Sequence, residues 1–178
     1  MKKGFSLPIF VAASAKAAVN KLLGNPFQNY EFIKVPDRKE VLKIKVHSSG
    51  FISRNEIALG ISFVDSGLSL DLTQNLEIWT IASFVKSNIV EKSAQNRINL
   101  KAGDGVGKFI DTSNICISKF ALNVLNANLL EIIPNGNRLE LEIIFPNGKF
   151  LAERTSNKSF GVVDGLSIIG TTAETYIS

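Results

Sequence analysis

Residues 153–172 combine glycines with hydroxyl and amide side chains in the sequence ERTSNKSFGVVDGLSIIGTT. Glycine lets a backbone pass close to another group or adopt positive φ. Hydroxyls and amides supply hydrogen bonds at short range. This combination is typical of a loop shaped around a polar ligand. The candidate binding residues in it are Arg154, Thr155, Asn157, Asp164, Gly165, Ser167, Gly170, Thr171 and Thr172.

A second glycine-rich segment, GDGVGK at 103–108, has the same character. It fails the dinucleotide-binding fingerprint, because that pattern requires glycine where Lys108 stands. Two interpretations stay open. The segment is either a tight turn between strands or a backbone nest for an anionic group with Lys108 beside it. The second interpretation makes candidate binding residues of Gly103, Gly105, Gly107 and Lys108.

Charged side chains offer several further chemistries. Asp65 and Asp71 share one polar loop and could either perform acid–base chemistry or cap turns. Asp164 could bind a cation or a pair of hydroxyls, or could form an Asx turn. Arg154 and Lys158 could pair with substrate carboxylates. Arginine is the better candidate because its planar fork matches a carboxylate in two hydrogen bonds.

His47 and Cys116 are the single histidine and the single cysteine of the chain. Ordinary zinc ligand sets and histidine-based triads therefore cannot be assembled within it, and we expect no protein-bound metal. We predict that His47 is a surface or turn residue and that Cys116 is a small core residue. One cysteine also excludes an internal disulfide and favours a reducing compartment.

The composition restricts the class of partner. The net charge of +4 over 178 residues is spread along the chain. Without a block of Lys and Arg we expect no nucleic-acid partner. A mild basic bias would suit a small substrate that carries several carboxylates. No apolar run approaches 18 residues, and Ser6 and Pro8 interrupt the apolar N-terminal stretch. We therefore expect a cytoplasmic protein with no membrane partner and no signal peptide.

Periodicity predicts how these residues are positioned. Helical spacing of apolar residues predicts helices over 8–23 and 117–130, the first rich in alanine and packed closely on a sheet. Alternation predicts strands over 31–35, 41–46, 57–64, 76–85 and 98–100. A hairpin is expected from 139–145 through Asn147-Gly148 into 150–153. We predict one α+β domain over 1–178, a mixed or antiparallel sheet with two main packed helices and a C-terminal hairpin.

The motifs ERTSN at 153–157 and GVVDGLSIIGTT at 161–172 resemble the CbiD family of cobalt-precorrin-5B C(1)-methyltransferases, which act in anaerobic cobalamin biosynthesis. The resemblance includes GDGVGK at 103–108 and GFS at 4–6 before the alanine-rich helix. It also includes DSG at 65–67, DLT at 71–73 and LEI at 76–78. The matches keep the family's order across nearly the whole chain.

The chain departs from the family in three respects. Leu7-Pro8 stands where the family usually has a threonine pair and a glycine. The pattern at 120–123 is helical where a proline- and asparagine-rich motif is usual. Family members are about twice as long, so the chain resembles their N-terminal half. The second, Rossmann-like α/β half is absent from this sequence and is an expected partner.

The resemblance implies transfer of a methyl group from S-adenosylmethionine to carbon 1 of a cobalt-containing tetrapyrrole, the corrin precursor cobalt-precorrin-5B. It also implies a fold like domain 2 of ribosomal protein S5. We expect the two glycine segments to line one cleft for the macrocycle or for the polar end of the methyl donor. Asp65 and Asp104 are candidate catalytic bases by type alone. The alternatives are a non-catalytic tetrapyrrole-binding module and an inactive fragment.

Overall fold

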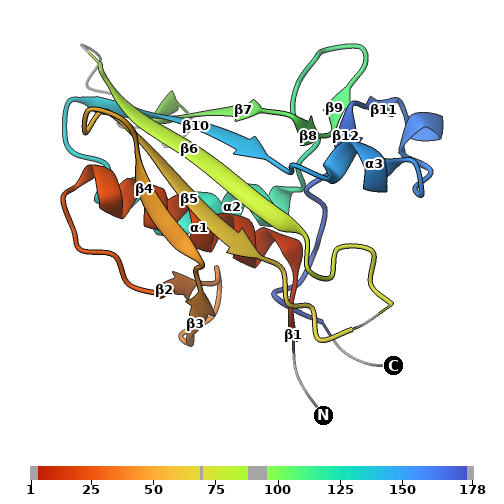
Figure 1. Cartoon of the computed structure of the whole chain (residues 1–178), viewed down its shortest axis with the longest axis horizontal. Helices are drawn as coiled ribbons and strands as arrows, with labels where there is room; N and C mark the ends of the chain where they lie inside the picture. The colour runs from red at the N-terminus through yellow and green to blue at the C-terminus, as the bar shows by residue number, and fades with distance from the viewer. Residues whose placement is uncertain (1–3, 69, 88–95, 176–178) are drawn as a thin grey trace.

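A mixed five-stranded sheet forms the centre of the structure (Figure 1), a computed structural model that describes residues 4–68, 70–87 and 96–175. Its strand order is β4-β5-β6-β10-β7. Neighbouring strands are antiparallel except for the parallel pair β10 and β7. The predicted mixed sheet is therefore confirmed. The strands are β4 (Ser48–Ser53), β5 (Ile57–Phe63), β6 (Glu77–Lys86), β10 (Asn137–Ile144) and β7 (Ile98–Ala102).

Helix α1 (Leu7–Leu22) packs very closely on one face of this sheet, as its alanine content predicts. A Cβ atom on Gly60 of β5 would lie 2.1 Å from the backbone oxygen of Ser14, so only glycine allows this approach. The hydroxyl of Ser14 donates to the oxygen of Gly60 over 2.8 Å and lies 3.0 Å from the hydroxyl of Thr80. Because these groups are buried, the bonds keep the helix–sheet contact free of unsatisfied polar atoms.

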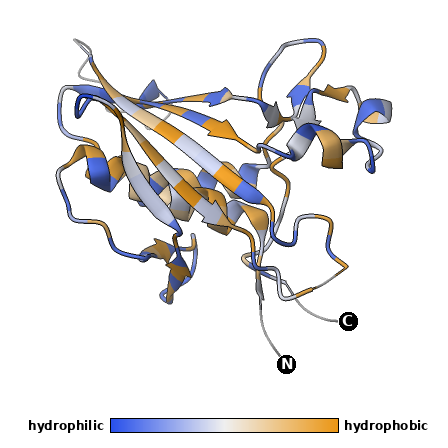
Figure 2. Cartoon of the chain, viewed as in Figure 1, coloured by the Kyte–Doolittle hydropathy of each residue, from blue (hydrophilic) through white to orange (hydrophobic). Residues whose placement is uncertain are grey.

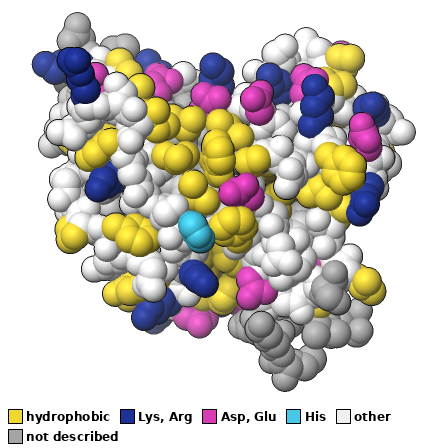
Figure 3. Space-filling model, viewed as in Figure 1, with side chains coloured by type: hydrophobic (Ala, Val, Ile, Leu, Met, Phe, Trp, Pro, Cys, Tyr) yellow, Lys and Arg dark blue, Asp and Glu magenta, His cyan; other side chains and the backbone are white. Residues whose placement is uncertain are grey.

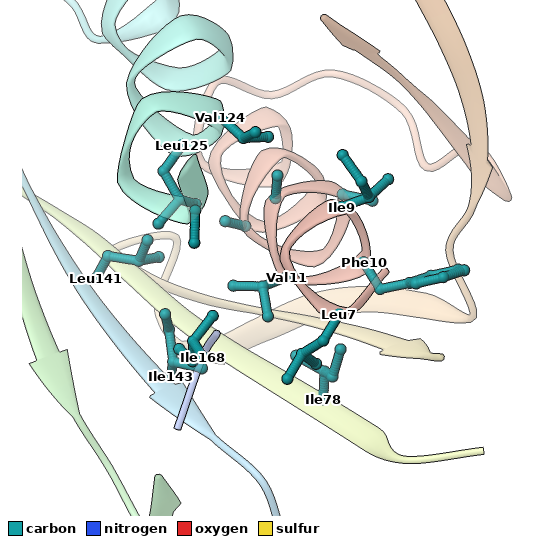
Figure 4. Packing of buried hydrophobic residues seen from close by; sticks show 14 of the residues in the cluster. Leu7, Ile9, Phe10, Val11, Ile78, Val124, Leu125, Leu141, Ile143 and Ile168 are labelled. Atoms are coloured by element: carbon teal, nitrogen blue, oxygen red, sulfur yellow. The ribbon is translucent and has the colours of Figure 1, made fainter. Parts of the chain in front are cut away.

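Helix α2 (Lys119–Leu129) packs beside α1 and completes the helical layer. It starts at Lys119 because the Ser118 side chain caps it by accepting from the amide of Ala121 over 3.1 Å. Its side chains Val124 and Leu125 meet residues of α1, β6 and β10 in the core (Figure 4). Apolar residues of both helices and of the sheet appear as orange bands in Figure 2. A 3₁₀ turn, η2 (Leu130–Ile132), follows α2.

The hairpin β2–β3 (Tyr30–Lys34 and Val41–Lys45) lies outside the central sheet. Asn128 of α2 holds it in place. Its amide group donates to the oxygen of Lys34 over 2.9 Å, and its side-chain oxygen accepts from the amide of Lys34 over 2.8 Å. Asn128 is fully buried, so both of its bonds to this strand edge are shielded from water.

The predicted C-terminal hairpin is wrong. Residues after the Asn147-Gly148 turn form a short helix, α3 (Gly148–Ala152), instead of a returning strand. Strand β10 already has β6 on one edge and β7 on the other, so a returning strand has no edge with which to pair. Gly148 also packs against the oxygen of Gly105, where a Cβ would lie at 2.1 Å, and this contact directs the chain away from the sheet.

Short strand pairs join segments that are far apart in sequence. β1 (Gly4–Phe5) pairs with β13 (Glu174–Thr175) beside the start of α1. β8 (Gly105–Val106) pairs with β12 (Gly165–Leu166), and β9 (Lys108–Phe109) pairs with β11 (Val162–Val163). Together with α3 and the 3₁₀ turn η3 (Asn157–Phe160), the last two pairs form a small glycine lobe at one end of the sheet (Figure 1).

Candidate functional site

The two glycine-rich segments meet in the glycine lobe. Gly165 stands opposite Gly105 in the parallel pair of β12 and β8, and the amide of Gly107 donates to the oxygen of Leu166 over 2.7 Å. A Cβ on Gly165 would lie 2.0 Å from the oxygen of Gly105. One on Gly105 would lie 1.9 Å from the oxygen of Phe145. These glycines therefore allow backbone to pack on backbone, and both are buried.

A pocket of about 270 Å³ opens beside this contact. Its cationic lining residues are Lys149 of α3 and Lys158 of η3, both exposed. Asn157 adds an amide, which donates to the oxygen of Gly165 over 3.3 Å. The carboxylate residues Glu153 and Asp164 also line the pocket. Asp164 has φ of 70°, so it forms the tight turn between β11 and β12, in a conformation that aspartate tolerates.

Arg154 lies next to the pocket on an exposed turn. Its guanidinium carbon is 5.6 Å from the centre of the Phe150 ring, within the range of a cation–π contact. Phe150 is 63% exposed, and Phe160 of η3 is 76% exposed. Thr155 uses its hydroxyl locally, donating to the oxygen of Ala152 over 2.6 Å and accepting from the amide of Asn157 over 3.3 Å. Arg154 thus supplies an accessible cation beside apolar surface.

The last part of the tail motif is placed elsewhere, against the N-terminal ends of the two long helices. The oxygen of Gly170 accepts from the Ser118 hydroxyl over 2.8 Å, and that of Thr172 accepts from the Ser6 hydroxyl over 2.6 Å. Ser167 is buried, and Thr171 is exposed. The predicted site residues therefore divide into two groups. Only Asn157, Asp164 and Gly165 line the pocket, with Arg154 and Thr155 adjoining it.

The first glycine segment, residues 103–108, contributes mainly backbone hydrogen bonds to the glycine lobe. The amide of Gly103 donates to the oxygen of Ile143 over 2.8 Å, and the oxygen of Asp104 accepts from the amide of Phe145 over 2.9 Å. The Asp104 side chain is exposed, while Lys108 is half-buried in the β9–β11 pair. Sequence reasoning missed Lys149, because the Asn147-Gly148 signal predicted a strand where α3 stands.

Asp65 belongs to a different pocket, of about 390 Å³, which it lines with Lys45, His47, Phe63 and Gln74. Its carboxylate accepts from the amide of Gly67 over 3.1 Å and from the amide group of Gln74 over 3.3 Å. In the same loop, the Asp71 carboxylate accepts from the amide and the hydroxyl of Thr73, both over 2.8 Å. Both carboxylates therefore cap turns within this loop.

The remaining sequence predictions concern His47, Cys116 and metals. His47 is exposed and Cys116 is buried, so both predictions are confirmed. Within residues 4–68, 70–87 and 96–175, no group of three or more His, Cys, Asp or Glu side chains could hold a metal ion. In the same ranges, no helix is long and apolar enough to cross a membrane.

Comparison with known proteins adds a family and a fold. A family model described as CbiD matches residues 1–176. The cobalt-precorrin-5B C(1)-methyltransferases of Prochlorococcus marinus subsp. pastoris strain MED4 and of P. marinus strain MIT 9312 are 64% and 63% identical to the whole chain. The chain spans 48% of each, about half their length.

A solved structure shares the fold. The crystal structure of the cobalamin biosynthesis protein cbiD from Archaeoglobus fulgidus superposes with a TM-score of 0.71 at 20% sequence identity. The match covers 99% of this chain and 55% of that one.

Proposed function

Because this chain belongs to the CbiD family, we propose that it is the N-terminal part of a cobalt-precorrin-5B C(1)-methyltransferase in anaerobic cobalamin biosynthesis. The enzyme would transfer a methyl group from S-adenosylmethionine to carbon 1 of the tetrapyrrole. The relatives at 64% and 63% identity are named for this activity, which supports the proposal.

One observation in the structure carries the substrate assignment. The pocket of the glycine lobe has Lys149 and Lys158 in its lining, with Arg154 on the adjoining turn. The substrate is a flat ring with acetate and propionate side chains, which are ionised at neutral pH. Ammonium and guanidinium groups bind such carboxylates, and the guanidinium does so with two parallel bonds. These three cations outnumber the two carboxylates of Glu153 and Asp164, so the net local charge favours an anionic ligand.

The local charge balance favours the methyl donor less, because its sulfonium group is itself a cation. We propose that S-adenosylmethionine is bound wholly or partly by a second, Rossmann-like α/β half of the complete enzyme. The relatives are about twice as long as this chain, which supports such a half. The glycine lobe would then hold the edge of the macrocycle so that carbon 1 faces the donor.

The reaction is an in-line displacement at the methyl carbon. The electron pair of carbon 1 forms the new bond, and the electrons of the broken carbon–sulfur bond remain on sulfur, which gives S-adenosylhomocysteine. The protein's main contribution to such a step is positioning. Of the two carboxylates proposed by type, Asp104 lies in the glycine lobe with an exposed side chain, whereas Asp65 accepts bonds within its own loop. Asp104 is therefore the stronger candidate for a proton acceptor.

The proposal includes three further features: the number of domains, the type of fold and the cellular location. The chain would form one domain over residues 1–178. Its architecture would be of the type found in domain 2 of ribosomal protein S5, which is supported by two helices packed on one face of a mixed sheet. A cytoplasmic location is supported by the single, buried cysteine, which suits a reducing compartment.

A non-catalytic tetrapyrrole-binding module or an inactive fragment is the second candidate, since the chain spans only about half of its relatives.

Calorimetric titration separates the candidates. The 178-residue chain is titrated with cobalt-precorrin-5B, with S-adenosylmethionine and with S-adenosylhomocysteine. Methylated tetrapyrrole is then sought by mass spectrometry, with and without the remaining part of the MED4 relative. Tetrapyrrole binding together with methylation in the lengthened chain supports the enzyme. Binding without methylation in either form supports the module, and no binding supports the fragment.

A further inference from the structure

The central sheet has one face that the helices do not cover. Gly60, Ser62 and Thr80 face α1, as their contacts with Ser14 and Phe10 show. Successive side chains of a strand point to opposite faces, so the residues between them point away from the helices. In Figure 1 the strands lie in front of both helices along this second face.

Apolar side chains from three strands form a continuous patch there, which we call the open-face patch. Ile61 of β5 and Ile144 of β10 both stand opposite Trp79 of β6, and Leu59 stands opposite Ile81. Figure 3 shows hydrophobic side chains gathered in the middle of this face. All of them keep part of their surface exposed. The patch consists of Ile57, Leu59, Ile61, Trp79, Ile81 and Ile144.

The sequence of β5 indicates that this face is normally covered. An antiparallel sheet with one face in water alternates apolar and polar residues along each strand. In β5 the outward positions are 57, 59, 61 and 63, occupied by Ile, Leu, Ile and Phe. The inward positions hold the small residues Ala58, Gly60 and Ser62, so the large apolar side chains of β5 all lie on the open face. An exposed patch of this kind marks an interaction surface.

Charged residues of both signs surround the patch. Glu140 and Glu142 of β10 and Glu77 of β6 share the outward face, and Lys101 of β7 stands beside Glu142. An apolar centre with a mixed polar rim is the usual anatomy of a protein–protein interface. On this face three carboxylates stand against two cations, Lys101 and Arg138, a balance that does not favour a ligand with many carboxylates. The tetrapyrrole is therefore a poor occupant of this face.

We propose that the open-face patch is the docking surface for the second half of the enzyme, an inference that rests on the proposed function. The chain spans 48% of its MED4 relative, which therefore has as much chain again. The position of β13 also favours this docking. The hydroxyl of Thr175 donates to the oxygen of Ser66, in the loop that joins β5 to β6 at the end of this face. A half that follows β13 would start at the end of this face.

Thiol accessibility at position 83 tests the docking. Ser83 lies on the outward side of β6 between Ile81 and Val85 and is partly exposed. A Ser83→Cys variant is made in the 178-residue chain and in the same chain joined to the remaining part of the MED4 relative. Reaction with a maleimide is followed by mass spectrometry of the peptide that carries residue 83. We expect the longer chain to react slower by about tenfold or more, because the thiol is exposed only on local opening.

A matched control is Glu56→Cys, in the exposed turn between β4 and β5, which should react equally fast in both chains. Trp79, the single tryptophan of the 178-residue chain, shows by unchanged emission that the Ser83→Cys chain is folded. Equal rates at position 83 in the two chains would overturn the proposal. Protection in the short chain that grows with its concentration would assign the patch to a second copy and overturn it too.

The tetrapyrrole is tested in the same assay. Protection of position 83 by cobalt-precorrin-5B in the short chain would make the patch a ligand site, against the proposal. Protection in the longer chain without methylation would support the docking and count against the proposed function alone. The two proposals can therefore fail separately.

Discussion

Single glycine residues in the glycine lobe allow two backbone segments to make close contact. Gly165 and Gly105 meet with no room for a side chain, whereas Gly50 in β4 has open space around its α-carbon. The glycines of the tail motif were expected to shape a loop around a ligand. In the structure Gly105 and Gly165 bring two distant backbones into contact, and Gly165 lines the pocket together with side chains from α3 and η3.

A Gly165→Ala substitution should therefore destabilise the protein. The new Cβ would meet the oxygen of Gly105 at 2.0 Å, and overpacking of this kind costs about 1–3 kcal/mol. Urea denaturation of the variant and of a Gly50→Ala control measures the difference. A Gly165→Ala protein as stable as that control would contradict the close contact.

Arg154→Ala should weaken tetrapyrrole binding. The exposed guanidinium is expected to pair with one substrate carboxylate, and an exposed pair of this kind contributes up to about fivefold in affinity. Calorimetric titration with cobalt-precorrin-5B measures the change, and Arg154→Lys should fall between the parent and the alanine variant. Lys39→Ala, in the exposed β2–β3 connection, is the control for a lost positive charge. Unchanged binding by Arg154→Ala would remove this residue from the site.

Glu31 should make stability depend on pH. Burial raises the pKa of its carboxyl group above the ordinary value, while the hydrogen bond from Asn20 and the charge of Lys16 oppose this. A folded-state pKa above the unfolded one means that ionisation disfavours folding. This cost is absent below the unfolded pKa and fully present above the folded pKa.

Glu31→Gln should accordingly raise Tm at neutral pH, and the gain should shrink as the pH falls toward the unfolded pKa of about 4.5. Thermal unfolding followed across that range checks the direction. Glu56→Gln, at an exposed turn, should show no comparable gain. If the gain in Tm grew as the pH fell, the pKa of Glu31 would be lowered by folding and not raised.

At the scale of elements, sequence patterns predict those whose partners are determined locally. Helix α1 and strands β2, β3, β5 and β6 follow from spacing and alternation within their own residues. The strand at 150–153 is predicted by a strong turn signal, but occupancy of both edges of β10 depends on β6 and β7 and cannot be deduced from that signal. Strand β4 contains Ser48-Ser49-Gly50, which is typical of a turn, and it forms because β5 offers an open edge.

The candidate site likewise has parts that the sequence predicts and parts that depend on distant residues. The sequence predicts that residues 103–108 and 153–172 act together, and the β8–β12 and β9–β11 pairs join them. It could not predict that Gly170 and Thr172 would turn toward the helix ends, since the bonds to Ser118 and Ser6 span 52 and 166 residues. Lys149 enters the pocket only because α3 replaces a strand.

The cap of α2 joins an element to the tail. Ser118 accepts from the amide of Ala121 and donates to the oxygen of Gly170. Ser118→Ala should cost about 1–2 kcal/mol, from the lost cap and the lost second bond. Denaturant unfolding measures this cost against Ser53→Ala, at the exposed end of β4. A loss no larger than that of the control would show that water replaces both bonds.

At the scale of the whole molecule, one ion pair connects the β2–β3 hairpin to β13. The guanidinium of Arg38 donates to both oxygens of Glu174 over 2.8 and 2.6 Å, and Glu174 is only 7% exposed. The two bonds to Glu174, followed by the one to Glu40, raise the pKa of Arg38. The pair therefore fixes the position of β13 relative to an element 136 residues away.

Arg38→Ala should lower Tm more than Lys39→Ala, because it leaves a buried carboxylate without its guanidinium partner. Arg38→Lys should recover part of the loss, since an ammonium group cannot make two parallel bonds. Thermal unfolding of the three variants at one salt concentration checks this order. Equal Tm values for Arg38→Ala and Lys39→Ala would mean that the pair contributes nothing to stability.

The pairing of β1 with β13 has a consequence for synthesis on the ribosome. Gly4 and Phe5 find their strand partners in Thr175 and Glu174, and the amide of Ser6 donates to the oxygen of Ala173. At typical elongation rates these partners are made roughly 9–35 s after residues 4–6. During that interval α1 can pack on the sheet, but the strand before it has no partner. Closure of β1 onto β13 therefore waits until β13 has been synthesised, and the nascent chain must keep β1 soluble until then.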